Sequence, residues 1–134
     1  KNFMNTKLNQ ILAEISAGEL IDKITILEIK KEKIKDSQKL KIIEKELLSL
    51  KKTFNEKIPD KSKIKDLLKT LKEINLKLWD IEENKRKAEK DKKFDDAFIQ
   101  LSRDVYKSND ERAKIKLKIN KTLGSNIQEV KSYY

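Results

Sequence analysis

Arginine is the residue type in this sequence best suited to holding an anion, because a planar guanidinium can bind a carboxylate or a phosphate through two parallel hydrogen bonds. The chain has 33 basic residues, of which only Arg86, Arg103 and Arg112 are arginine. Arg112 falls within an apolar stripe of helical spacing, in line with Val105 and Ile119. Because a buried guanidinium needs a carboxylate or carbonyl partner, the sequence predicts a polar cluster around Arg112.

A polar ridge at 3-4-3 spacing supplies candidate partners for this arginine. The ridge runs from Trp79 through Glu82 and Arg86 to Glu89, beside the apolar seam of the preceding predicted helix. Glu28 borders the seam of the first helix. We expect Glu82, Glu89 and Glu28 to be the partners of Arg112 and Arg86. The pattern fits a structural salt-bridge network, which we favour, and it also fits a pocket for an anionic ligand. The candidate ligand-binding residues are Trp79, Glu82, Arg86, Glu89, Arg112 and Glu28.

The composition excludes several kinds of catalytic and metal chemistry. Cysteine and histidine are both absent, so the chain has no thiol nucleophile, no imidazole base, no disulfide and none of the usual zinc ligands. No acidic run has the spacing of a calcium-binding loop. We therefore favour a non-enzymatic protein without metal or cofactor, and leave the identity of any catalytic residue open. Because no long uncharged apolar run and no secretory signal occurs, we expect no membrane span and a cytoplasmic location.

The chain is strongly basic, with a net charge of +10 and an isoelectric point near 9.6, which favours anionic partners. Residues 30–65 hold 13 lysines against six acidic residues, a net charge of +7. Non-specific binding of nucleic acid by this lysine-rich hairpin is therefore an open alternative. Phe54 is the only aromatic residue among these lysines, and no helix-turn-helix pattern is present. Sequence-specific recognition of nucleic acid is not expected.

The stretch from Ser16 to Lys30 predicts the central helix of the fold. Ser16 and Glu19 have the spacing of a capping box, in which each side chain binds a backbone N–H of the first turn. A helix is therefore expected from about Ala17 to Lys35. A helix that is apolar on more than one side must be covered on more than one side, so the other helices should pack on it. Its main stripe consists of Leu20, Ile24, Leu27 and Ile34, and Ile21, Thr25, Ile26 and Ile29 widen its apolar surface.

Three further helices are expected from the same kind of pattern. The first stripe loses phase at Asp36 and Ser37, either of which can cap a second helix. The only proline, Pro59, marks a turn, and a third helix is expected over residues 62–90. The last helix should begin near Phe94 and end at Gly124 in a left-handed C-cap. These features predict an all-α fold, an antiparallel up-down bundle of three to four long amphipathic helices with coiled-coil-like, left-handed packing.

The length of 134 residues predicts a single helical-bundle domain over residues 1–134. Residues 1–15 are expected to form a lead-in strap, and residues 125–134 a tail that folds back over the bundle. The favoured function is a non-catalytic interaction module that presents its outer face or tail to a protein partner, or to a second copy in a homodimer. An anionic small-molecule site, enzymatic or not, in the Arg/Glu cluster is the first alternative, and non-specific nucleic-acid binding is the second.

Four sequence blocks resemble a bacterial family of short, all-helical proteins of unknown function that is also met in marine sequences. The blocks are GELIDKITILEIK (18–30), LWDIEENKR (78–86), FIQLSRDVYKSNDERAKIK (98–116) and GSNIQEVKSY (124–133). The resemblance covers nearly the whole chain and implies one domain. It implies no activity, cofactor or site residue.

Overall fold

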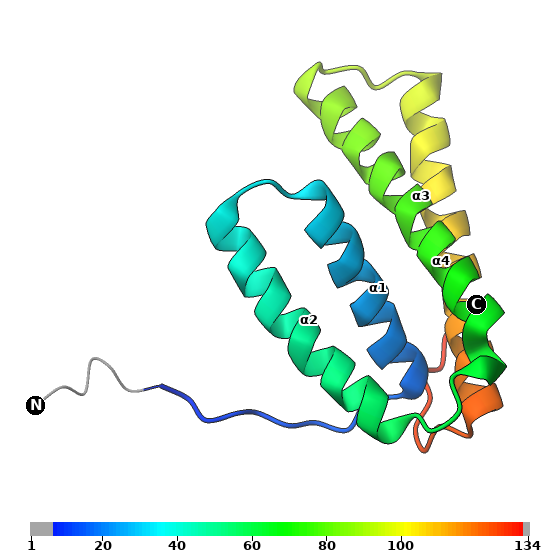
Figure 1. The fold of residues 1–134 in the computed structure, drawn as a ribbon. Helices are drawn as coiled ribbons and strands as arrows, with labels where there is room; N and C mark the ends of the chain where they lie inside the picture. The colour runs from blue at the N-terminus through cyan, green and yellow to red at the C-terminus, as the bar shows by residue number, and fades with distance from the viewer. Residues whose placement is uncertain (1–6, 133–134) are drawn as a thin grey trace, which may run out of the picture.

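Four α-helices joined by short turns make up most of the computed structural model, which describes residues 7–132 (Figure 1). No strand occurs within that range, and the predicted all-α helical bundle is confirmed. Helices α1 and α2 form one hairpin, and α3 and α4 form a second (Figure 1). The elements are α1 (Ala17–Lys33), α2 (Ser37–Lys57), a 3-10 turn (Ser62–Ile64), α3 (Lys65–Lys90) and α4 (Asp96–Leu123).

Helix α1 begins where its capping residue predicts. Ser16 Oγ accepts a hydrogen bond from the backbone N–H of Glu19 at 3.1 Å, which satisfies one of the donors that a first helical turn leaves unpaired. The prediction of the second hydrogen bond of the capping box, from the backbone N–H of Ser16 to the side chain of Glu19, is wrong. The Glu19 carboxylate accepts a hydrogen bond from the ammonium of Lys116 on α4 at 2.7 Å instead, because a charged donor from another helix competes better than the backbone.

The ends of α2 and α4 follow local signals in the same way. Asp36 caps α2 by accepting hydrogen bonds from the N–H groups of the second and third residues after it. Gly124 ends α4 at φ 65°, the left-handed C-cap that was predicted. Helix α4 begins at Asp96, two residues after Phe94, because the side chain of Asp95 accepts a hydrogen bond from an N–H of the first turn and sets the start.

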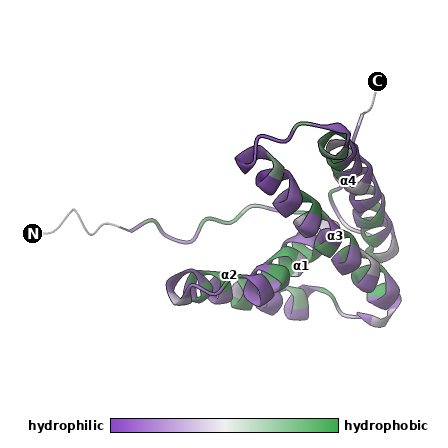
Figure 2. Cartoon of the chain, turned by 90° about the horizontal axis from the view of Figure 1, so that it is seen from above, coloured by the Kyte–Doolittle hydropathy of each residue, from purple (hydrophilic) through white to green (hydrophobic). Residues whose placement is uncertain are grey.

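Helix α1 lies at the centre of the bundle, as predicted. It packs against α2, α3 and α4, whereas α2 lies close to α1 alone among the helices. Ile21 and Ile29 of α1 are each 1% exposed, which requires cover from more than one side. Figure 2 shows hydrophobic residues on the sides of the helices that face one another and hydrophilic residues outside. The buried core around Ile21 contains Leu20, Ile24, Leu27, Ile43, Leu47, Ile58, Ile64, Leu71 and Ile119.

Helices α3 and α4 extend beyond the α1–α2 hairpin at the end where they join each other (Figure 1). At about 1.5 Å per residue, the 17 residues of α1 cannot cover the 28 residues of α4. Phe94 is accordingly 54% exposed and packs edge to face on Phe98, with ring centroids 5.3 Å apart. The first part of the predicted apolar stripe of the last helix therefore lies outside the core.

Residues 7–15 run away from the bundle without forming a helix or a strand, and we call them the extended segment (Figure 1). Leu8, Ile11 and Leu12 in this segment are 85%, 78% and 81% exposed. The predicted lead-in strap also includes residues 1–6, and the predicted tail residues 133–134, which lie outside the described range.

Candidate functional site

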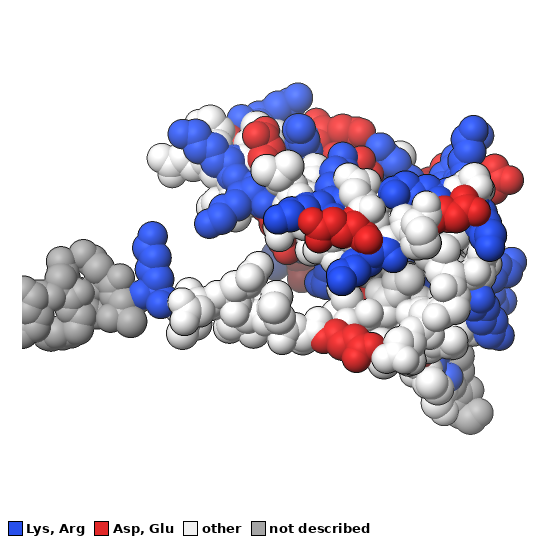
Figure 3. Space-filling view, turned by 60° about the horizontal axis from the view of Figure 1, so that its bottom comes forward, with Lys and Arg blue, Asp and Glu red and all other residues white. Residues whose placement is uncertain are grey.

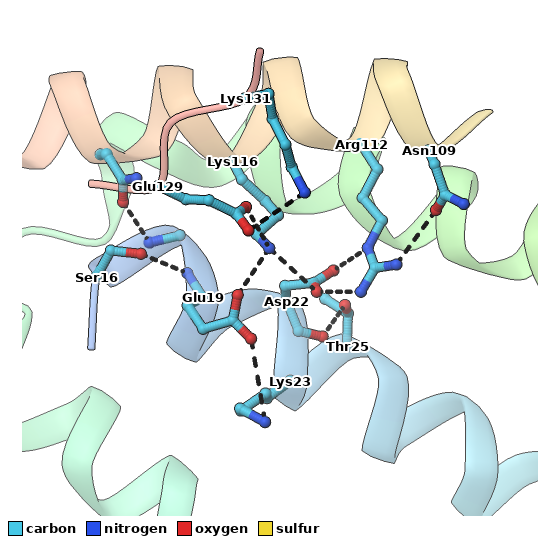
Figure 4. Close-up of polar contacts among 12 residues, drawn as sticks. Ser16, Glu19, Asp22, Lys23, Thr25, Asn109, Arg112, Lys116, Glu129 and Lys131 are labelled. Atoms are coloured by element: carbon cyan, nitrogen blue, oxygen red, sulfur yellow. Dashed lines mark hydrogen bonds and ion pairs between the residues drawn. The ribbon is translucent and has the colours of Figure 1, made fainter. Parts of the chain in front are cut away.

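The buried carboxylate of Asp22 on α1 is the centre of a network of polar contacts between the helices (Figure 4). Asp22 is 1% exposed. Arg112 on α4 binds it through two hydrogen bonds: Nε donates to Oδ1 at 2.9 Å, and Nη2 donates to Oδ2. Asn75 on α3 donates from Nδ2 to Oδ1 at 3.0 Å. The predicted pairing of Arg112 with a carboxylate is therefore confirmed, in the bidentate geometry that only arginine provides.

The identity of that carboxylate was predicted wrongly. Within residues 7–132, Arg112 forms its ion pair with Asp22 and with none of Glu82, Glu89 and Glu28. The prediction missed a second buried stripe of α1 that contains polar residues and faces α3 and α4. This stripe has 4-3-4 spacing and consists of Gly18, Asp22, Thr25 and Ile29, all of which are buried. An aspartate in phase with a buried stripe was the signal in the sequence that could have identified the partner.

Lys116 on α4 joins Asp22 to two further carboxylates. Its Nζ lies 2.7 Å from Glu19 Oε2, 3.4 Å from Glu129 Oε1 and 3.8 Å from Asp22 Oδ2. Burial opposes the charge of Lys116, but the hydrogen bond to Glu19 and the three negative charges outweigh it and raise its pKa above the usual 10.5. The hydrogen bonds to Asp22 likewise raise the pKa of Arg112, against the opposing effect of desolvation. Both cations therefore remain charged.

The carboxyl end of α4 docks on the amino end of α1 through backbone contacts. The N–H of Gly18 donates to Asn120 Oδ1 at 2.6 Å, and the N–H of Ala17 donates to Ser125 Oγ at 3.0 Å. A Cβ on Gly18 would lie 2.5 Å from the backbone oxygen of Lys116. The two helices can approach this closely only because residue 18 has no side chain.

The tail after α4 folds back onto this network, as Figure 4 shows for Glu129 and Lys131. The carboxylate of Glu129 lies 3.3 Å from Lys131 Nζ as well as 3.4 Å from Lys116 Nζ. Burial by itself would raise the pKa of Glu129, but the charges of these two lysines outweigh it and lower the pKa below 4.5. These charges add to the hydrogen bond of Ser125 in holding the tail against the bundle.

The network is closed, which limits the chemistry that it can perform. Both carboxylate oxygens of Asp22 accept hydrogen bonds from Arg112, so the charge of this carboxylate is already compensated within the chain. In the described part of the chain, Ser108 Oγ is the only buried side-chain oxygen or nitrogen without a partner. No three acidic side chains of residues 7–132 are placed to hold a metal ion. The arrangement neutralises buried charges and sets the position of α4 on α1.

Four of the six predicted ligand-binding residues, among them Arg112 of the buried network, line a groove of about 670 Å³ between α1 and α3. Trp79, Glu82 and Arg86 line it from α3, and Arg112 lines it from α4. Its apolar lining consists of Ile26, Ile29, Ile34 and Leu78. Among the described residues, Arg86 has no ion-pair partner, so its guanidinium is available to a ligand.

The other two predicted residues lie outside this groove. Glu28 pairs with Lys51 of α2 at 3.3 Å and lines a separate hollow between α1, α2 and α3. Glu89 is exposed near the end of α3 and belongs to neither the groove nor the buried network. The α1–α2 hairpin ends before it reaches Glu89, for the same reason that Phe94 is uncovered.

The aromatic ring of the lysine-rich α1–α2 hairpin, Phe54, is partly covered. Phe54 is half-buried, and the ammonium of Lys61 lies 5.2 Å from the centroid of its ring. A base that stacks on a protein needs an open ring face, and over Phe54 such a base would compete with the ammonium of Lys61.

The fold and the network together define a class: an all-α protein whose residues 7–132 form four α-helices, fastened internally by ion pairs around the buried Asp22. The chain belongs to the family of unknown function DUF6165, whose family model matches residues 11–134. No curated protein and no solved structure matches it. Among the helices described here, none has a stretch long and apolar enough to cross a membrane.

Proposed function

We propose that this protein is a non-catalytic helical interaction module, and that the extended segment (residues 7–15) binds a protein partner. The observation that carries this proposal is the exposure of Leu8, Ile11 and Leu12, each at least 78% exposed. Full burial of one such side chain contributes about 1.5–3 kcal/mol. Contiguous exposed apolar residues mark interaction sites in soluble proteins, and this segment has three of them in five positions.

The spacing of these residues favours one mode of recognition. Leu8, Ile11, Leu12 and Ile15 stand at i, i+3, i+4 and i+7, which is one face of an α-helix. A segment that is extended in the free chain can form a helix when its apolar face enters a groove of the partner. The closed ion network supports a non-catalytic role, because it provides a rigid scaffold and no free reactive group. A single domain over residues 1–134 and a cytoplasmic location stay predictions.

This proposal is tested by photo-crosslinking in cells that naturally contain the chain. A photoreactive amino acid at position 11 should give a discrete adduct, and the crosslinked protein should be the same one in every repeat. The matched control is position 42, since Ile42 on α2 is also strongly exposed, at 70%. Equal or absent adducts at the two positions would contradict the proposal.

A second candidate function is the binding of an anionic small molecule in the groove between α1 and α3. The unpaired guanidinium of Arg86 beside an apolar lining that includes Leu78 favours it. Such a site fits a ligand with one apolar part and one carboxylate or phosphate. The adjacent Glu82 would reject a dianion more strongly than a monoanion.

The groove is tested with benzoate and phenyl phosphate as probes, and Trp79 is the reporter because it is the only tryptophan of the chain. We expect saturable changes in its fluorescence that Arg86→Gln abolishes. Arg103→Gln, at an exposed position outside the groove, should leave binding unchanged. A Trp79 signal that does not respond to either probe would eliminate this candidate.

A further inference from the structure

One end of the bundle, which we call the uncharged end, combines two stretches without a charged residue in a chain of which 42% is charged. Residues 8–13 and 122–128 are two of the three longest stretches without a charged residue, and the fold brings them to the same end. Ser125 Oγ accepts a hydrogen bond from the N–H of Ala17 at 3.0 Å, and Asn126 donates to Glu14. Figure 3 shows uncharged atoms continuing from the extended segment onto the bundle, while lysine and arginine cover much of the remaining visible surface.

The base of the extended segment borders a hollow of about 600 Å³ at this end. Its apolar lining includes Ile15 and Leu20 of the first part of the chain, Ile58 and Pro59 of the turn after α2, and Leu123 at the end of α4. The charged residues in its lining are Glu14, Lys57, Asp60 and Lys63, two acidic and two basic. The hollow is therefore balanced in charge, unlike the chain as a whole.

This balance identifies the kind of partner that fits. An acidic protein would be attracted most strongly to the lysine-rich faces and would gain little at this end. A second copy of the chain has the same net charge of +10, so most pairs of faces repel each other. An interface between identical copies places one patch against itself, and a balanced patch lets Glu14 and Asp60 face Lys57 and Lys63 of the other copy.

We propose that a second copy of this chain occupies the uncharged end, and that the extended segment of each copy lies in the hollow of the other. Leu8, Ile11 and Leu12 then become buried against the apolar lining of the partner copy. This inference rests on the proposed interaction module and names its partner. It also explains why these aliphatic residues occur in a segment that its own bundle leaves uncovered.

The first test is sedimentation equilibrium of the purified full chain over micromolar concentrations. We expect a monomer–dimer equilibrium that Leu8→Ser/Ile11→Ser/Leu12→Ser weakens by roughly a hundredfold or more. The matched control is Ile42→Ser/Leu48→Ser, at two exposed positions of α2, which should leave the dimer constant unchanged. A wild-type chain that remains a monomer at several hundred micromolar, or equal weakening by both variants, would overturn the inference.

The second test uses the charges of the hollow and does not depend on the apolar residues. Glu14→Lys makes the hollow basic, and Lys57→Glu/Lys63→Glu makes it acidic, so each variant alone should dimerise more weakly than the wild type. An equimolar mixture should recover dimer, as a heterodimer of the two variants. Circular dichroism melts verify that both variants remain folded, and a mixture of folded variants that does not recover would overturn the inference.

The outcomes separate this inference from the proposed function. If position 11 crosslinks in cells to a different protein while the purified chain is monomeric, the second copy is wrong and the interaction module stands. If the adduct at position 11 is a second copy of this chain and the mixed variants associate, both stand. A purified dimer that assembles through α2, with equal adducts at positions 11 and 42, would contradict both.

Discussion

Arg112→Ala is expected to lower the free energy of unfolding by about 3 kcal/mol, because it leaves the buried carboxylate of Asp22 without its bidentate partner. Removing one member of a buried ion pair typically costs about 3–5 kcal/mol. The lower end of that range applies here, since Asn75 still donates to Asp22 at 3.0 Å and the ammonium of Lys116 lies 3.8 Å away. Urea unfolding monitored by circular dichroism measures the change.

A second substitution at the partner should restore much of this loss. Arg112→Leu also removes the guanidinium, and Asp22→Asn then removes the uncompensated charge, so the double variant should be more stable than Arg112→Leu alone. Glu82→Gln should give no such rescue, because Glu82 does not contact Arg112 through an ion pair. Lys51→Ala, which breaks the more exposed pair with Glu28, should cost no more than about 1 kcal/mol. An unchanged stability for Arg112→Ala would show that the network does not fasten α4 to α1.

Gly18→Ala is expected to destabilise the protein by roughly 1–3 kcal/mol, the usual cost of forcing a methyl group into a packed contact. The new Cβ would lie 2.5 Å from the backbone oxygen of Lys116 and 2.9 Å from Asn120 Oδ1. Helix α4 would have to move away from α1, which would also weaken the hydrogen bond between the Gly18 N–H and Asn120. The thermal melting temperature and the free energy of unfolding measure the effect.

Gly124, the other glycine of the chain, provides a control in which the loss of stability has a different cause. Gly124 has φ 65°, and a Cβ added there would have open space around it, so Gly124→Ala should cost about 1 kcal/mol through backbone strain alone. That loss should not affect the contacts of Lys116. A Gly18→Ala variant that gains about 0.4–1 kcal/mol, as a glycine in an unobstructed helix would, would contradict the close approach of α1 and α4.

The sequence by itself determined the helices and most of their limits. Ser16, Asp36, Pro59 and Gly124 mark boundaries through interactions that span only a few residues, and such interactions do not depend on the rest of the fold. The central position of α1 also followed from the sequence, because apolar residues on several sides of one helix require several neighbours. That Arg112 must pair with a carboxylate followed from its place in an apolar stripe.

Only the tertiary structure decided which carboxylate pairs with Arg112 and where the hydrophobic core ends. Asp22 and Arg112 are 90 residues apart, and they meet because Gly18 lets α4 approach α1 in one orientation. Glu82 had equally suitable chemistry and lines the same groove as Arg112, but the ion pair of Arg112 is formed with Asp22. The relative lengths of the two hairpins left Phe94 and Glu89 uncovered. Helical periodicity specifies which residues share a face, whereas the choice of facing partner depends on how closely and at what rotation two helices pack, which no local spacing contains.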